Sequence, residues 1–233
     1  MVKEMQVLFS SARSCGATSV AINFALLQQQ LTPDERVGVI QCTQFPDLHF
    51  ILGQSQPHPV SKLLDFLNTD EKTPQILSRV CQKYIVDTYH SAPNDWSDVE
   101  SSKFKILWDL LCKNYDHLFI DLHASFPKKL KKIITQTVDH QVLITTLDPA
   151  SLEATNILSQ QSPEKAFWIL GNQGPKNAYS PKALPANARW LGSLPWDEKP
   201  FWDQSFQGLP VALHRKSKWK SALQEILIQL QSL

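Results

Sequence analysis

The chain has 233 residues, 42% of them hydrophobic, and its 23 Lys and Arg nearly balance its 22 Asp and Glu, for a formal net charge of +1. This length suits one α/β domain spanning residues 1–233, and the balanced charge gives no electrostatic case for nucleic acid or an anionic membrane as a partner. The four cysteines form no C-x-x-C motif, which argues against a disulfide framework or a zinc site. No apolar run approaches the ~20 residues of a membrane-spanning helix, and the N-terminus does not resemble a signal peptide. We therefore expect a cytoplasmic protein.

Short apolar runs alternate with amphipathic segments along the chain. The runs predicted to be strands are 6–9, 36–42, 83–88, 117–122, 141–146, 166–171 and 188–192. Most are continuously apolar, as strands buried on both faces are. Helical periodicity follows at 18–30, at 101–113 and from about Ser217 onward. The alternation predicts a doubly wound, mostly parallel β-sheet flanked by helices on both faces.

The last predicted helix carries an apolar stripe with lysines near its start. Its members are Trp219, Leu223, Ile226, Leu227, Leu230 and Leu233. Such a stripe can lie in a membrane interface or pack on a sheet. Packing on the sheet is our prediction, so that any membrane association would be indirect. We interpret the basic clusters at 128–132 and 215–220 as solvated helix faces.

The first predicted strand leads into a loop of small residues and then directly into a helix. This arrangement directs backbone N–H groups and the helix N-terminus to one place, which is an anion site. A complete P-loop reads G-x-x-x-x-G-K-[ST], in which the lysine contacts the β- and γ-phosphates and the hydroxyl binds Mg²⁺. Here the loop closes with Gly16, Ala17, Thr18 and Ser19, so the glycine and the hydroxyl are present and the lysine is absent. Ser and Thr also begin many helices that bind no nucleotide.

The loop resembles the deviant Walker A motif of the ParA/MinD family, K-G-G-x-G-K-[ST]-[ST]. The two lysines and the first two glycines of the motif are replaced, whereas its last glycine and both hydroxyl residues are kept. In chain order the eight positions are Ala12, Arg13, Ser14, Cys15, Gly16, Ala17, Thr18 and Ser19. An alanine after that glycine is similar to the CpaE/TadZ branch, proteins of Flp/Tad pilus assembly.

Further segments resemble elements of the same family in the same order. Residues 115–121 are similar to its Walker B strand, which ends in Asp121, and residues 191–197 to its L-G-x-[IL]-P-x-D element. Residues 141–155 look like its V-L-L-V-T-x-P-D-x-x-S-L segment. Gln41 and Thr43 stand where the second strand of the family carries aspartates.

The resemblance implies a nucleotide site with Mg²⁺ and ATP or ADP, bound weakly if at all. The implied cofactor-binding residues are Arg13, Ser14, Cys15, Gly16, Ala17, Thr18, Ser19 and Asn172, the last facing adenine, and the implied metal ligands are Thr18 and Asp121. Three alternatives stay open. Asp121 could cap a helix beginning at residues 124–126, Asn172 could serve a turn, and Arg13 could either replace a lysine or close the loop.

Loss of one key charge contact commonly costs about 10²–10³ in rate, so we expect no catalytic residues and little ATP turnover. The resemblance implies a CpaE/TadZ-like localisation or assembly factor for a pilus or secretion machine. It would form a homodimer around the loop at 13–18, dock to a secretion protein or polar scaffold, and be polar or membrane-peripheral only through partners. The alternatives are a weakly active ParA/MinD ATPase in flagellar or cell-division positioning or DNA partition, and a structural protein that binds no nucleotide.

Overall fold

The computed structural model describes residues 4–11, 15–43, 51, 86–160, 166–174, 184 and 187–233. Within these residues the strands form a seven-stranded sheet in the order β3-β2-β4-β1-β5-β6-β7, and every neighbouring pair is parallel. The strands are β1 Met5–Ser10, β2 Val37–Cys42, β3 Asp87–His90, β4 His117–Leu122, β5 His140–Thr146, β6 Phe167–Gly174 and β7 Ala188–Pro195. The predicted doubly wound parallel sheet is confirmed.

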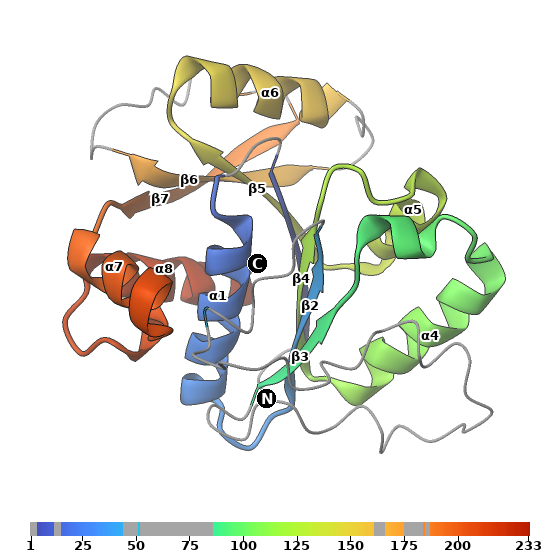
Figure 1. Cartoon of the computed structure of the whole chain (residues 1–233), viewed down its shortest axis with the longest axis horizontal. Helices are drawn as coiled ribbons and strands as arrows, with labels where there is room; N and C mark the ends of the chain where they lie inside the picture. The colour runs from blue at the N-terminus through green and yellow to red at the C-terminus, as the bar shows by residue number, and fades with distance from the viewer. Residues whose placement is uncertain are drawn as a thin grey trace.

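Helices cover both faces of this sheet (Figure 1). They are α1 Ala17–Leu31, α4 Ser101–Asn114, α5 Lys128–Thr137, α6 Pro149–Gln160, α7 Glu198–Gln207 and α8 Lys218–Gln231, with short 3-10 turns η2 Pro93–Trp96 and η4 Val211–Leu213. In Figure 1, α1, α7 and α8 lie to the left of the central strands, and α4 and α5 lie to the right. Parallel strands are joined by crossover connections that usually contain a helix. Because the chain adds strands on both sides of β1, right-handed crossovers place helices on both faces of the sheet.

Two hydrophobic cores result, one on each face of the sheet. The first lies under α1 and α8 and contains Phe9, Phe24 and Phe119, whose rings are 5.2–6.3 Å apart between centroids. The second lies under α4 and α5 and contains Leu118 and Ile120. Alternate residues of β4 thus enter opposite cores, which explains why this strand is apolar apart from His117 and Asp121.

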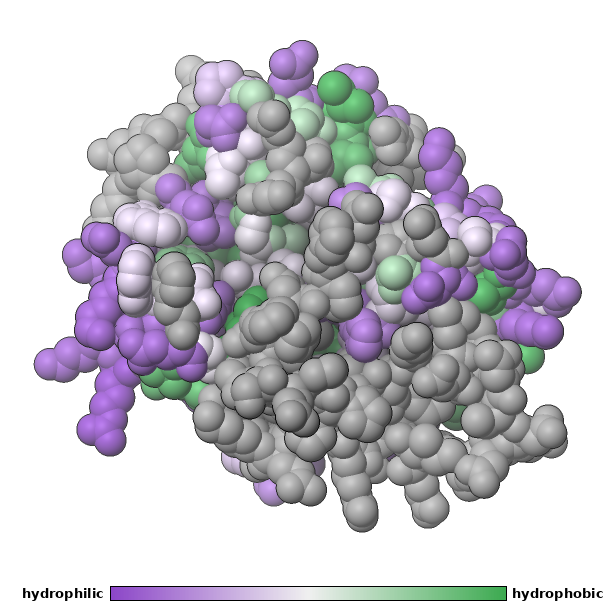
Figure 2. Space-filling view, viewed as in Figure 1, coloured by the Kyte–Doolittle hydropathy of each residue, from purple (hydrophilic) through white to green (hydrophobic). Residues whose placement is uncertain are grey.

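The apolar stripe of α8 packs inward, as predicted. Trp219, Leu223, Ile226, Leu227 and Leu230 are buried. Leu233 was placed on this stripe but is 51% exposed, because α8 ends before it, at Gln231. The outer surface over α7 and α8 is largely hydrophilic in Figure 2. No helix in the described part of the chain is long and apolar enough to span a membrane.

Three sequence predictions differ in detail from the structure. The third strand is Asp87–His90 rather than 83–88, and residues 83–85 lie outside the described part. The first helix, predicted at 18–30, spans Ala17–Leu31, and Leu31 at its end is 42% exposed. The helix predicted to begin at 124–126 begins instead at Lys128, after a turn that ends at Pro127.

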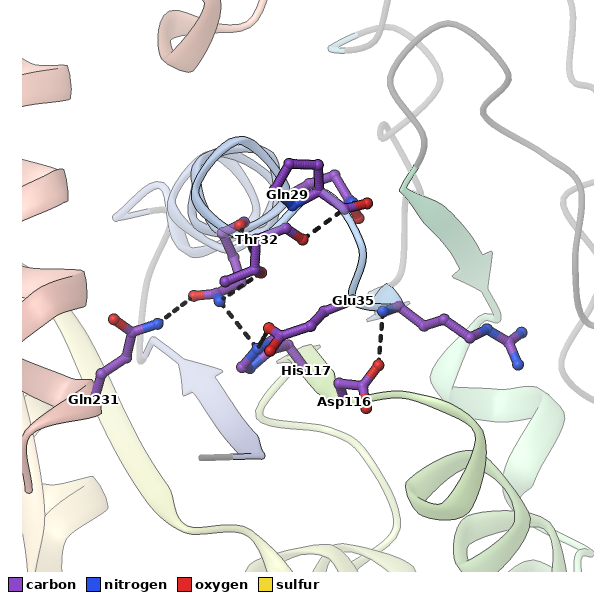
Figure 3. Close-up of polar contacts among 9 residues, drawn as sticks. Gln29, Thr32, Glu35, Asp116, His117 and Gln231 are labelled. Carbon is purple, nitrogen blue, oxygen red and sulfur yellow. Dashed lines mark hydrogen bonds and ion pairs between the residues drawn. The ribbon is translucent and has the colours of Figure 1, made fainter. Parts of the chain in front are cut away.

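A buried polar cluster joins the end of α1 to the start of β4 and the end of α8 (Figure 3). The His117 side chain is fully buried, and its Nε2 lies 2.6 Å from Glu35 Oε2 and 3.0 Å from Gln28 Nε2. Gln28 Oε1 in turn accepts a 2.8 Å hydrogen bond from Gln231 Nε2. Since a carboxylate oxygen can only accept, His117 Nε2 donates to Glu35. The cluster lies at the amino-terminal end of β4, whereas Asp121 lies near its carboxyl end.

We predict that His117→Ala lowers the free energy of unfolding by about 2–4 kcal/mol, because it leaves a cavity and removes the buried partner of Glu35. The matched control is His123→Ala, at an exposed residue just after β4 whose ring hydrogen-bonds Ser125 in the neighbouring turn, and it should change stability by less than about 0.5 kcal/mol. Urea denaturation followed by circular dichroism measures both. Equal effects for the two variants would contradict the role assigned to the cluster.

Candidate functional site

The N-terminus of α1 meets the carboxyl ends of β1, β2 and β4, where an open α/β sheet places its ligand crevice. Gly16 precedes α1 in the left-handed conformation, with φ 83°, and no side chain caps the helix. A Cβ added at Gly16 would lie 2.6 Å from Asn172 Nδ2. Glycine is therefore required here twice, by its backbone angle and by the approach of a neighbouring side chain.

Thr18, Asp121 and Gln41 form a hydrogen-bonded group at this edge. Thr18 Oγ1 donates to Asp121 Oδ2 at 2.5 Å, and Gln41 Nε2 donates to Thr18 Oγ1 at 3.4 Å. Gln41 and Asp121 are direct neighbours in the register of β2 and β4, and they are 0% and 3% exposed. The two predicted metal ligands are thus adjacent. Asp121 contacts Thr18 rather than capping a helix at 124–126, where the structure has a turn.

Asn172 holds the loop from the other side. Its Nδ2 donates to the carbonyl oxygen of Cys15 at 2.8 Å, and its Oδ1 accepts from Trp219 Nε1 at 3.2 Å. The side chain is fully buried. Asn172 lies in β6 beside an irregularity of the strand. The next residue, Gln173, has φ 59°, and the register between β6 and β7 shifts between Asn172 and Gly174. These two bonds leave one Nδ2–H and one Oδ1 lone pair of Asn172 for an adenine contact, and that predicted role stays a prediction.

Ser19 and Cys15 also have partners inside the protein. Ser19 Oγ accepts from Gln204 Nε2 at 3.0 Å, and Gln204 Oε1 accepts from Asn23 Nδ2 at 2.8 Å. This network connects α1 to α7 beneath the site. Cys15 Sγ lies 3.8 Å from Thr146 Oγ1 and is buried. The sequence predicted neither the Gln204 and Asn23 contacts nor the Trp219 contact, although Asn23 stands out as an amide within an apolar helix.

The remaining predicted residues divide into two groups. Ala17 is the first residue of α1 and is 7% exposed. Arg13 and Ser14 lie outside the described residues, so their predicted roles stay untested.

Other reactive groups near the strand ends do not form a second centre. In the described ranges no cluster of three or more His, Cys, Asp or Glu could hold a metal ion. Burial raises the pKa of the Cys42 thiol to about 12, so the group stays protonated at neutral pH. Hydrogen bonds from Thr146 and Ser151 lower the pKa of Asp148, which caps α6 by accepting from Ser151 N at 3.0 Å. These groups serve the structure around the loop.

Comparison with known proteins places this geometry in context. No family model and no curated protein matches the sequence. A ParA family ATPase from Chlorobium tepidum superposes with a TM-score of 0.79 at 18% identity, over 98% of this chain and 99% of that chain. The MinC:MinD cell division protein complex from Aquifex aeolicus gives a TM-score of 0.78 at 17% sequence identity, over 98% of this chain and 96% of that chain. The fold is that of the ParA and MinD ATPases. A putative plasmid partition protein from Borrelia burgdorferi bound to AMPPNP gives 0.74 at 14%, over 98% of both chains.

Similarity to ParA and MinD structures at 18% identity or less shows the fold alone. Whether the site fits Mg²⁺ and ATP must come from its own residues. Mg²⁺ takes six oxygen ligands at about 2.0–2.1 Å. Thr18 and Asp121 supply oxygen atoms, but an amide N–H of Gln41 is directed at the same hydroxyl. Alanine occupies both lysine positions of the motif, 12 and 17. These residues do not fit a resident Mg²⁺·ATP.

We predict that Gly16→Ala lowers the free energy of unfolding by about 2–3 kcal/mol, through left-handed strain and displacement of the Asn172 amide. Asn172→Ala removes the group that the new Cβ would contact. The loss of unfolding free energy in the double variant should therefore be smaller, by about 1 kcal/mol, than the sum of the losses in the two single variants. Urea denaturation of the four proteins measures this coupling, and strict additivity would show that Gly16 and Asn172 do not constrain each other.

Proposed function

We propose that this chain is a partner-binding protein with the ParA/MinD fold that does not turn over ATP efficiently. It acts as a CpaE/TadZ-like localisation or assembly factor for a pilus or secretion machine. The observation that carries the proposal is the hydrogen bonding at the start of α1: Thr18 bonds Asp121 in the sheet, and Ser19 bonds Gln204 in α7. The proposal includes weak or absent binding of ATP or ADP.

The chemistry of phosphoryl transfer supports the proposal. Charge develops on the γ-phosphate oxygens, and enzymes stabilise it with lysine, arginine and metal ions. Alanine at positions 12 and 17 removes two such cations, and Gln41 replaces an acidic side chain. Each loss alone costs about 10²–10³ in rate. Together they should bring turnover near background, even without additivity.

Partner binding is supported by what remains intact. The described sheet and its helices match the fold of MinD, a protein solved in complex with MinC, over nearly the whole chain. A domain that keeps this fold but lacks the cations for catalysis can still bind partner proteins through its surface. We propose that the chain forms a homodimer about the loop, binds a secretion protein or polar scaffold, and reaches a pole or the membrane periphery only through that partner.

A weakly active ATPase in cell-division positioning or DNA partition is the second candidate. The observation that favours it is the 2.5 Å contact between Thr18 and Asp121, which keeps the two predicted metal ligands together.

We predict that calorimetric titration detects only weak or no binding of ATP in the presence of Mg²⁺, and that phosphate release equals the rate without protein. Asp121→Asn is the control for contamination, since a contaminating ATPase does not depend on this residue. Release that falls by about 10²–10³ in Asp121→Asn would show that the chain is itself an ATPase and would defeat the proposal. Duplex binding that weakens steeply with salt would instead indicate DNA partition.

A further inference from the structure

Gln41 is a neutral amide in the most enclosed part of the site. It lies near the end of β2, is 0% exposed, and pairs in register with Asp121 on β4. A buried amide must have hydrogen-bond partners, and one of them is the hydroxyl of Thr18, which accepts from Gln41 Nε2 at 3.4 Å. The amide therefore presents the positive end of its dipole to Thr18.

The hydroxyl of Thr18 has one hydrogen and two lone pairs. The hydrogen is donated to Asp121, and one lone pair accepts from Gln41. A cation bound to the hydroxyl would need a lone pair that faces it, and a metal next to Asp121 would need space free of N–H groups. The Gln41 amide interferes with both requirements, because its N–H repels a cation and its donation leaves the Thr18 hydroxyl only one further lone pair.

We propose that the Gln41 amide takes the place of a divalent cation beside Thr18 and Asp121, so that the start of α1 is held without metal. The proposal rests on the proposed function and deepens it by naming the group that stands in for Mg²⁺ at the same site. The start of α1 keeps one arrangement whether or not Mg²⁺ or its nucleotide complex is present. A partner that binds near the loop therefore meets the same surface in both conditions.

The substitution that tests this is Gln41→Glu, which keeps the size of the side chain and exchanges its N–H donor for a carboxylate oxygen. It creates a set of two carboxylates and one hydroxyl, the ligand chemistry that Mg²⁺ and Mn²⁺ prefer. Without metal, two neighbouring buried carboxylates repel each other and lower stability. Metal should reverse that loss.

The experiment uses MnCl₂ as the probe, without nucleotide, in calorimetric titration and thermal unfolding of the full chain. Wild-type protein should show no saturable binding at millimolar Mn²⁺ and no change in Tm. Gln41→Glu should bind Mn²⁺ saturably and gain about 4–8 °C in Tm at saturation. The gain should vanish in Gln41→Glu/Asp121→Asn. Gln136→Glu, an exposed position on α5, controls for added charge and should behave as wild type.

Saturable binding by wild-type protein that is lost in Asp121→Asn would overturn the proposal. So would a folded Gln41→Glu variant that gains no Mn²⁺ binding. If Gln41→Glu does not fold with or without metal, Gln41→Ala replaces it: removal of the amide should make Mn²⁺ binding measurable, and binding no different from wild type would again overturn the proposal. Mn²⁺ binding by the wild-type protein, lost in Asp121→Asn and without phosphate release, would defeat this inference and leave the proposed function standing. ATP turnover by the wild-type protein would defeat the proposed function.

Discussion

A carboxylate buried between two strands must have hydrogen-bond donors around it, and the arrangement of this site follows from that constraint. Asp121 is 3% exposed in the middle of the sheet. The hydroxyl of Thr18 donates to it at 2.5 Å, which fixes the first turn of α1 over the carboxyl ends of β1 and β4. The position of the first turn of α1 relative to the sheet thus depends on a hydrogen bond within the protein.

The rest of α1 is held in the same way along its length. Asn23 connects it to η4 and α7 through Ala212 N and Gln204. Gln28 connects its last turns to Gln231 in α8, at the amino-terminal ends of the strands. Because these polar groups are buried, losing any one leaves an unsatisfied partner that costs about 1–3 kcal/mol. A helix fixed at its start, middle and end has little freedom to transmit ligand binding.

The sequence was sufficient for the fold because buried parallel strands are continuous apolar runs, and six of the predicted strands overlap the observed ones closely. The third strand was displaced because β3 is an edge strand that pairs only with β2 and lacks such a run. The resemblance to the ParA/MinD motifs also implied that Thr18 and Asp121 lie together, because it made both of them metal ligands. The direction of the Asn172 side chain could not be predicted. It depends on the left-handed Gln173 and on Trp219, which is distant in sequence.

The pattern of kept and replaced motif residues has a physical explanation in these contacts. Gly16 is needed for a left-handed backbone against Asn172, Thr18 bonds Asp121, and Ser19 bonds Gln204. Each of these residues stabilises the folded chain whether or not a nucleotide binds. A lysine at position 17 would have a triphosphate as its chief partner, and without one it would place a costly charge at a buried position, since Ala17 is buried. A chain relieved of binding a triphosphate can therefore exchange its lysines for alanine and still require the glycine and the hydroxyls.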